Sequence, residues 1–269
     1  MIFDLPWKSF RSPSVVTPME DLLGDATGSR MPEIVPEELT VARAVAAVSV
    51  CPTGALELRE TPTDHLLELD YGRCVGCGWC RQAAPEAITE ARRIFHCGAP
   101  KRQLKLAWSL TRKEEVRPDA PHPESTRVVE EAARNIFKWM GRALNIRALD
   151  SGSCNGCEAE LTALTSPWYD LERFGIHFVA SPRHADLLLV TGPVARNLHE
   201  AVLQTWQAMP EPKRVLAVGA CACSGGVFAA SPAIAGPLDQ VIPVDGYVAG
   251  CPPTPAMVLT GILRVIQKR

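Results

Sequence analysis

Four cysteines in the second half of the chain each follow a short apolar run. Cys154 and Cys157 form a C-x-x-C motif, and Cys221 and Cys251 stand alone far downstream. The apolar runs read as strands, and they are Ile146–Leu149, Val215–Val218 and Ile242–Val248. Loops that follow parallel strands lie together at the carboxyl edge of an open sheet, where ligands bind. The sequence therefore predicts that three loops bring four thiols to one place.

Four thiolates from separated loops suit either an iron-sulfur cluster or zinc. Zinc ribbons usually have two C-x-x-C pairs, whereas this site has one pair and two single cysteines. Gly219, Gly225 and Gly226 flank Cys221, and such glycines let backbone approach a bulky inorganic core and direct N–H groups at its sulfurs. We expect a cluster, with zinc or buried structural thiols as the alternatives.

Apolar runs and helical stretches alternate throughout this half. Further strands are expected at His177–Ala180 and Leu187–Val190, the strand of the run Ile242–Val248 is expected at Ile242–Val244, and helices are expected at Arg127–Leu144, Glu158–Leu164, Leu198–Met209 and Ala256–Gln267. Alternation at this interval implies a parallel sheet covered by helices on both faces. The predicted fold class of this half is therefore α/β.

The first half has a different cysteine pattern. Cys74-x-x-Cys77-x-x-Cys80 is followed by Ala84-Pro85, where a bacterial ferredoxin has Cys-Pro, and Cys51-Pro52 stands upstream. In two-cluster ferredoxins the fourth cysteine of each run binds the other cluster. By that crossed rule the four remaining cysteines form one complete ligand set.

The positions that have lost cysteine form the other complete set. Counting back from Cys51 by the ferredoxin spacing gives Ala47, Ala44 and Val41, and Ala84 is the fourth. Residues 41–50 read as a short helix whose methyl groups fill the vacated place by hydrophobic contact. The alternative is a lone zinc knuckle with an unrelated Cys51.

Three segments of the second half resemble a known family. They are Ser153-Cys-Asn-Gly-Cys-Glu158, Gly219-Ala-Cys-Ala-Cys-Ser-Gly-Gly226 and Val248-Ala-Gly-Cys-Pro-Pro-Thr254. These segments resemble the small electron-transfer subunit of membrane-bound nickel-iron hydrogenases of the formate hydrogenlyase type, and the 20-kDa subunit of respiratory complex I. The resemblance covers residues 136–266. In complex I the first two ligands are adjacent, whereas Asn155-Gly156 separates them here, which favours the hydrogenase branch.

This resemblance implies a flavodoxin-like, doubly wound parallel sheet, and the resemblance of the first half to a bacterial-type ferredoxin implies a small ferredoxin-like α+β domain before it. Together they imply two 4Fe-4S clusters, the first held by Cys51, Cys74, Cys77 and Cys80 and the proximal one by Cys154, Cys157, Cys221 and Cys251. Catalysis would lie on a large-subunit partner within an oxidoreductase complex that also holds other electron-transfer and membrane subunits, so no catalytic residue is expected in this chain. The alternatives are the equivalent subunit of a complex I-like quinone oxidoreductase, or a non-redox assembly factor that holds zinc or a labile cluster.

Composition limits the remaining function classes. The formal net charge of −2 gives no support for nucleic-acid binding. No apolar run reaches the roughly twenty residues of a spanning helix, and the first residues show no secretory pattern. We expect a cytoplasmic protein, peripheral on the cytoplasmic face of the inner membrane. Ten cysteines in that reducing compartment favour metal ligation over disulfides.

Four segments are expected: an extended arm over 1–31, the ferredoxin-like domain over 32–100, a linker over 101–126 and the second domain over 127–269. Cys97 and Cys223 fall outside both ligand sets, and Cys223 is expected to be a small buried residue. Glu158 and Glu160 are expected to be helix-N-terminal acids. Complex I relatives carry an acid near the position of Glu160, so a role in proton movement is the alternative there.

Overall fold

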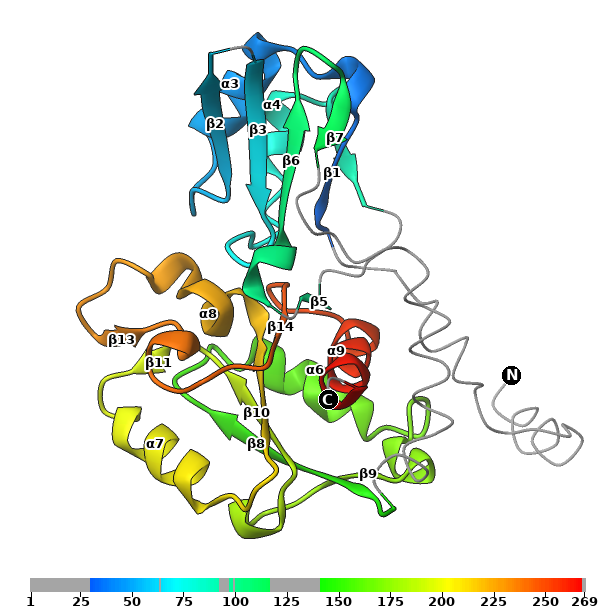
Figure 1. The fold of residues 1–269 in the computed structure, drawn as a ribbon, viewed down its shortest axis with the longest axis vertical. Helices are drawn as coiled ribbons and strands as arrows, with labels where there is room; N and C mark the ends of the chain where they lie inside the picture. The colour runs from blue at the N-terminus through cyan, green and yellow to red at the C-terminus, as the bar shows by residue number, and fades with distance from the viewer. Residues whose placement is uncertain (1–29, 63, 92–96, 99, 117–140, 268–269) are drawn as a thin grey trace, which may run out of the picture.

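The computed structural model describes residues 30–62, 64–91, 97–98, 100–116 and 141–267. The four-stranded sheet of the first half and the six-stranded sheet of the second lie at opposite ends of the long axis (Figure 1). The expected N-terminal arm lies outside these ranges except for its last two residues, and so does the helix expected over 127–144 except for 141–144. Within the described residues, no helix has the length and apolarity needed to cross a bilayer.

The larger sheet has six strands in the order β5-β14-β12-β10-β8-β9. Its parallel strands are β8 (Leu144–Asp150), β9 (Ile176–Phe178), β10 (Leu187–Thr191), β12 (Arg214–Val218) and β14 (Gly246–Val248). In chain order these five strands are arranged 2-1-3-4-5, which is the flavodoxin-like order. β5 (Cys97–Gly98) comes from the first half of the chain and pairs antiparallel with β14. The expected doubly wound α/β fold is confirmed.

Helices cover both faces of this sheet. Successive strand residues point to opposite sides, so the consecutive apolar residues of β10 give both faces an apolar surface that helices bury. Leu187 and Leu189 of β10 pack with α6 (Gly156–Leu164) and α9 (Pro255–Gln267). Leu188 and Val190 pack on the other face, with α7 (His199–Ala208) and α8 (Gly219–Ser224). A small strand pair, β11 (Val194–Ala195) with β13 (Ile234–Gly236), lies beside the second face. The carboxyl ends of the parallel strands are thus left for the loops that carry cysteine.

One strand differs from its expected position. The run Ile242–Val244 lies before β14, which begins at Gly246 opposite Leu216 of β12. Pro243 has no N–H to donate to a neighbouring strand, so pairing starts beyond it. Ile242 is nevertheless buried, and for this reason the run is apolar and has the sequence pattern of a strand.

The first half begins with two strand pairs, two α-helices and a short 3₁₀ helix. β1 (Pro32–Ile34) pairs antiparallel with β4 (Ile88–Glu90), and β2 (Leu56–Thr61) with β3 (Asp64–Asp70). A short helix, η1 (Pro36–Glu38), precedes α3 (Val41–Ser49), and α4 (Trp79–Ala83) follows β3. This β-α-β-β-α-β order is the α+β arrangement expected of a ferredoxin-like domain.

Alanines occupy the positions where the ferredoxin pattern has lost cysteine. Ala44 and Ala47 of α3 are fully buried, and Ala84 is 2% exposed. Val41 is 43% exposed, because it stands in the first turn of α3, where Thr40 caps the helix by accepting the N–H of Arg43. The apolar filling expected at this place is therefore provided by the alanines.

Residues 101–116 differ from the linker expected over 101–126. They form η2 (Lys101–Leu104), β6 (Lys105–Ser109) and β7 (Glu114–Val116), which extend the first sheet in the order β2-β3-β6-β7. Leu104 and Trp108 are buried in its core, and this burial explains why residues 101–116 form regular structure instead of a linker. Residues 117–126 lie outside the described ranges, and the boundaries of the four segments remain predictions.

Asp64 ties β3 to the turn after β6, and its ionisation should affect stability. Its carboxylate accepts hydrogen bonds from the Ser109 hydroxyl and from the Thr111 N–H, which lower its pKa from 3.8 to about 2. A lowered folded-state pKa means that the carboxylate stabilises the fold above pH ~4, and that this contribution is lost as pH falls toward 2. We expect Asp64→Asn to lower the melting temperature at pH 7 and to lose that effect near pH 2. Thermal unfolding at several pH values measures this, with Glu33→Gln on β1 as control; a deficit constant from pH 7 to pH 2 contradicts it.

Candidate metal centres

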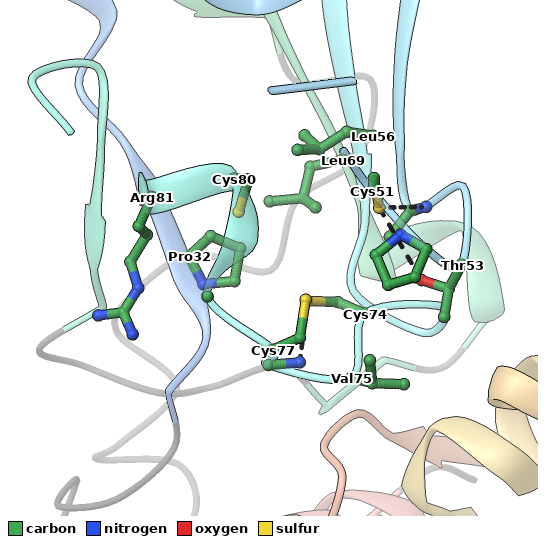
Figure 2. Close-up of a pocket in the computed structure, with 14 residues that line it drawn as sticks. Pro32, Cys51, Thr53, Leu56, Leu69, Cys74, Val75, Cys77, Cys80 and Arg81 are labelled. Carbon is green, nitrogen blue, oxygen red and sulfur yellow. Dashed lines mark hydrogen bonds between the residues drawn. The ribbon is translucent and has the colours of Figure 1, made fainter. Parts of the chain in front are cut away.

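The first cysteine set lines one pocket between α3, β3 and α4. Cys51 follows α3, Cys74 and Cys77 lie in the loop after β3, and Cys80 is in α4. All four border the same empty volume of about 390 Å³, part of which is open to solvent (Figure 2). The structure thus brings Cys51 to the trio that is distant from it in sequence, as the crossed spacing requires.

The surroundings of this pocket suit thiolates bound to a positively charged core. Burial is the main cause that raises the pKa of Cys74 to about 12, and the neighbouring cysteines Cys80, Cys51 and Cys77 contribute to this rise. Backbone N–H groups of Ala55 and Gly76 donate to the sulfurs of Cys51 and Cys74 at 3.2 and 3.5 Å. The other lining side chains include Leu56, Leu69 and Pro32. Buried thiols of this kind ionise only when cationic iron or another metal compensates their charge.

The second cysteine set lies at the carboxyl edge of the large sheet. Cys154 and Cys157 follow β8, Cys221 is in α8 directly after β12, and Cys251 follows β14. Burial is the main cause that raises the pKa of Cys221 to about 11, and the nearby Cys251 and Cys154 contribute to this rise. The pKa of Cys157 is raised by burial, then by Glu158 and by the other three cysteines. The four thiols from three loops are therefore neighbours in the fold.

Two glycines let the backbone reach these sulfurs. A Cβ on Gly219 would lie 2.6 Å from Sγ of Cys157, and a Cβ on Gly226 would lie 3.0 Å from Sγ of Cys221. Both glycines have positive φ, +89° and +54°, a region that other residues rarely adopt. Gly225 differs, because its Cβ would meet Ala229 rather than a sulfur. The spaces around the two sulfurs are thus kept free of side chains, which fits a bulky inorganic group.

Glu158 organises the loop that carries Cys154 and Cys157. Its carboxylate accepts hydrogen bonds from the hydroxyl of Ser153, at 2.6 Å, and from the hydroxyl of Thr191 at the end of β10. Ser153 in turn accepts the N–H of Asn155 at 3.0 Å. Sequence reasoning gave Glu158 only a helix-dipole role; the serine and threonine that hold it come from separate strand ends. Glu160 is partly exposed, and desolvation raises its pKa.

The two cysteines outside the sets are buried. The Cys97 thiol donates to the carbonyl of Met257 at 3.3 Å, and the Cys223 thiol donates to the carbonyl of Val248 at 3.5 Å. Both pack in apolar cores, so they behave as small buried residues. Across the described ranges, no three or more His, Cys, Asp or Glu side chains form a group that could hold a metal ion in the conformation seen. That the eight cysteines bind iron therefore stays a prediction.

Comparisons with known proteins match the second half of the chain. The family model described as "NADH ubiquinone oxidoreductase, 20 Kd subunit" matches residues 154–265. A probable membrane-bound hydrogenase subunit of Pyrococcus furiosus is 46% identical over 140 residues, which cover 52% of this chain and 84% of the relative. Formate hydrogenlyase subunit 7 of Escherichia coli is 47% identical over 127 residues, covering 47% and 50%. An NADH-quinone oxidoreductase subunit of Geotalea daltonii is 46% identical over 147 residues, covering 54% and 84%.

Proposed function

Because the chain belongs to the family of the 20 Kd subunit of NADH ubiquinone oxidoreductase, we propose that it is the electron-transfer subunit of a membrane-associated nickel-iron hydrogenase complex of the formate hydrogenlyase type. It carries two 4Fe-4S clusters and relays electrons to or from an active site on a large subunit. Members of the family are subunits of oxidoreductase complexes, as the names of the relatives state. The placement on the cytoplasmic face of the inner membrane is part of this proposal.

The observation that carries the proposal is the assembly of eight cysteines into two sets of four. Each set draws its thiols from separate segments, one in a pocket of the first half and one from loops at the carboxyl edge of the large sheet. A 4Fe-4S cluster bound by four thiolates accepts and releases single electrons. The chain's own residues hold that group, supply N–H donors to the sulfurs in the first set, and leave room beside the sulfurs in the second.

The hydrogenase branch is supported by the C-x-x-C spacing of Cys154 and Cys157, and by the hydrogenase and formate hydrogenlyase relatives at 46% and 47% identity. A relative named as an NADH-quinone oxidoreductase subunit is equally similar. The equivalent subunit of a complex I-like quinone oxidoreductase is therefore the second candidate.

Metal analysis of the chain tests the clusters. Anaerobically purified protein is expected to contain about eight irons and about eight acid-labile sulfides per chain, and to give two reducible centres by low-temperature EPR. Zinc without sulfide would contradict the proposal, and so would hydrogen turnover by the isolated chain. Purification of the tagged chain with its partners separates the two candidates. A nickel-containing large subunit is expected for the hydrogenase, and a nickel-free partner is expected for the quinone enzyme.

A further inference from the structure

The segments that carry the two cysteine sets approach each other at Gly72 and Cys223. Gly72 lies two residues before Cys74 of the first set, and Cys223 lies two residues after Cys221 of the second. A Cβ built on Gly72 would lie 3.6 Å from the Cβ of Cys223. Two short backbone segments and one non-bonded contact therefore connect a ligand position of one set to a ligand position of the other.

Cys223 is fully buried at this junction. Its thiol donates to the carbonyl of Val248, in the strand that leads to Cys251. The side chain is thus a buried thiol, held by a hydrogen bond at the place where the two halves approach.

Close neighbours, and not its backbone conformation, favour glycine at position 72. The φ of Gly72 lies outside the left-handed region that favours glycine, and its Cβ would meet Oδ1 of Asp70 at 3.1 Å and Cδ1 of Leu104 at 3.2 Å, with the Cβ of Cys223 at 3.6 Å. A single methyl group requires small shifts of Asp70 and Leu104, whereas a branched side chain adds volume that also presses on Cys223 of the second half.

An ion pair keeps the halves in one position beside the contact. Nζ of Lys101, in η2, lies 2.8 Å from Oδ2 of Asp239 in the second half, with the two side chains 31% and 26% exposed. The hydroxyl of Tyr247 donates to the same oxygen at 3.3 Å. Lys101 also lies 5.6 Å from the centre of the Tyr247 ring, a cation–π distance. Apolar residues of both halves, among them Leu104 and Leu238, share one core at this place.

We propose that the Gly72–Cys223 contact is the electron-transfer junction within this chain. The inference rests on the proposed function. Gly72 and Cys223 act as positioning residues: they bind no iron, and their close packing holds the two cysteine sets at the separation over which a single electron passes. The electron comes from an external reductant, which the pulse reduction in the test below supplies, and no bond is formed or broken. Because electron tunnelling weakens steeply with distance, even a small separation of the halves should slow it.

Gly72→Val tests the junction. Iron content and both EPR centres are expected to be retained, because position 72 is not a ligand. The magnetic interaction between the two reduced centres is expected to weaken, and electron redistribution after pulse reduction is expected to slow several-fold. Gly72→Ala is the matched control and is expected to stay close to the unmodified chain in both measurements.

If Gly72→Val does not fold, a second variant, Lys101→Met, tests the same junction. Lys101→Met removes the ion pair to Asp239 without adding volume, and it is expected to weaken the magnetic interaction to a smaller degree. Unchanged coupling and unchanged redistribution in variants that retain both centres would overturn the junction alone. An unmodified chain without two centres would overturn the proposed function and the junction with it.

Discussion

Replacement of Cys51 by alanine is expected to lower the iron content from about eight to about four atoms per chain. Cys51 is separated in sequence from Cys74, Cys77 and Cys80, but it lines the same pocket. Without it the first set has three thiols, and the N–H of Ala55 loses the sulfur that it donates to. The second set is made of other residues, so its EPR signal is expected to remain.

Cys97→Ala is the matched control, because Cys97 is also a cysteine of the first half but is buried against α9. Iron and sulfide content are expected to stay at the unmodified level in that variant. Loss of iron from Cys97→Ala equal to that from Cys51→Ala, or full iron content in Cys51→Ala, would contradict the ligand set drawn from the ferredoxin spacing.

Gly219→Ala is expected to remove the second centre and to leave the first intact. The new Cβ would lie 2.6 Å from Sγ of Cys157, well inside contact distance. In the metal-free chain the cysteine side chain can rotate away from the methyl group, but a sulfur bound to iron has no such freedom. The loss should therefore appear in iron content and in one EPR signal while the chain still folds.

Backbone strain has to be separated from this clash. Alanine at φ +89° costs about 1–2 kcal/mol, and Gly141→Ala brings a similar cost at φ +66° with no described atom within 4 Å of its Cβ. Both variants are expected to show similar thermal destabilisation of the metal-free chain, and only Gly219→Ala should lose iron. Loss of iron from both would mean that strain, not the contact with Cys157, is responsible.

The fold of the second half was predicted well from the sequence, because the patterns that mark its strands and loops lie within short segments. Apolar runs such as Leu187–Val190 coincide with strands, and the cysteines at 154, 157, 221 and 251 follow strand ends, where the flavodoxin-like order brings loops together. The crossed ferredoxin spacing correctly placed Cys51 beside the trio, because that spacing encodes a tertiary contact directly. Ala44, Ala47 and Ala84 stand at the cysteine positions that the same spacing defines, and they too are buried.

The features that sequence reasoning missed depend on contacts between distant segments. β6 and β7 lie in a stretch rich in lysine, arginine and glutamate, which becomes part of a sheet only because β6 pairs with β3 and β7 pairs with β6. The contact of Gly72 with Cys223 leaves no pattern within either segment. Likewise the serine and threonine hydroxyls around Glu158 converge from separate strand ends.

The pairing of β5 with β14 has a consequence for how the two halves can be separated. β5 contributes only Cys97 and Gly98, but it occupies the N–H and C=O groups along the outer side of β14. An exposed strand edge of this kind is a template for open-ended pairing between molecules, which leads to aggregation and fibrils. The first half therefore shields the sheet of the second from self-association, and a fragment cut between residues 98 and 144 would lack that protection.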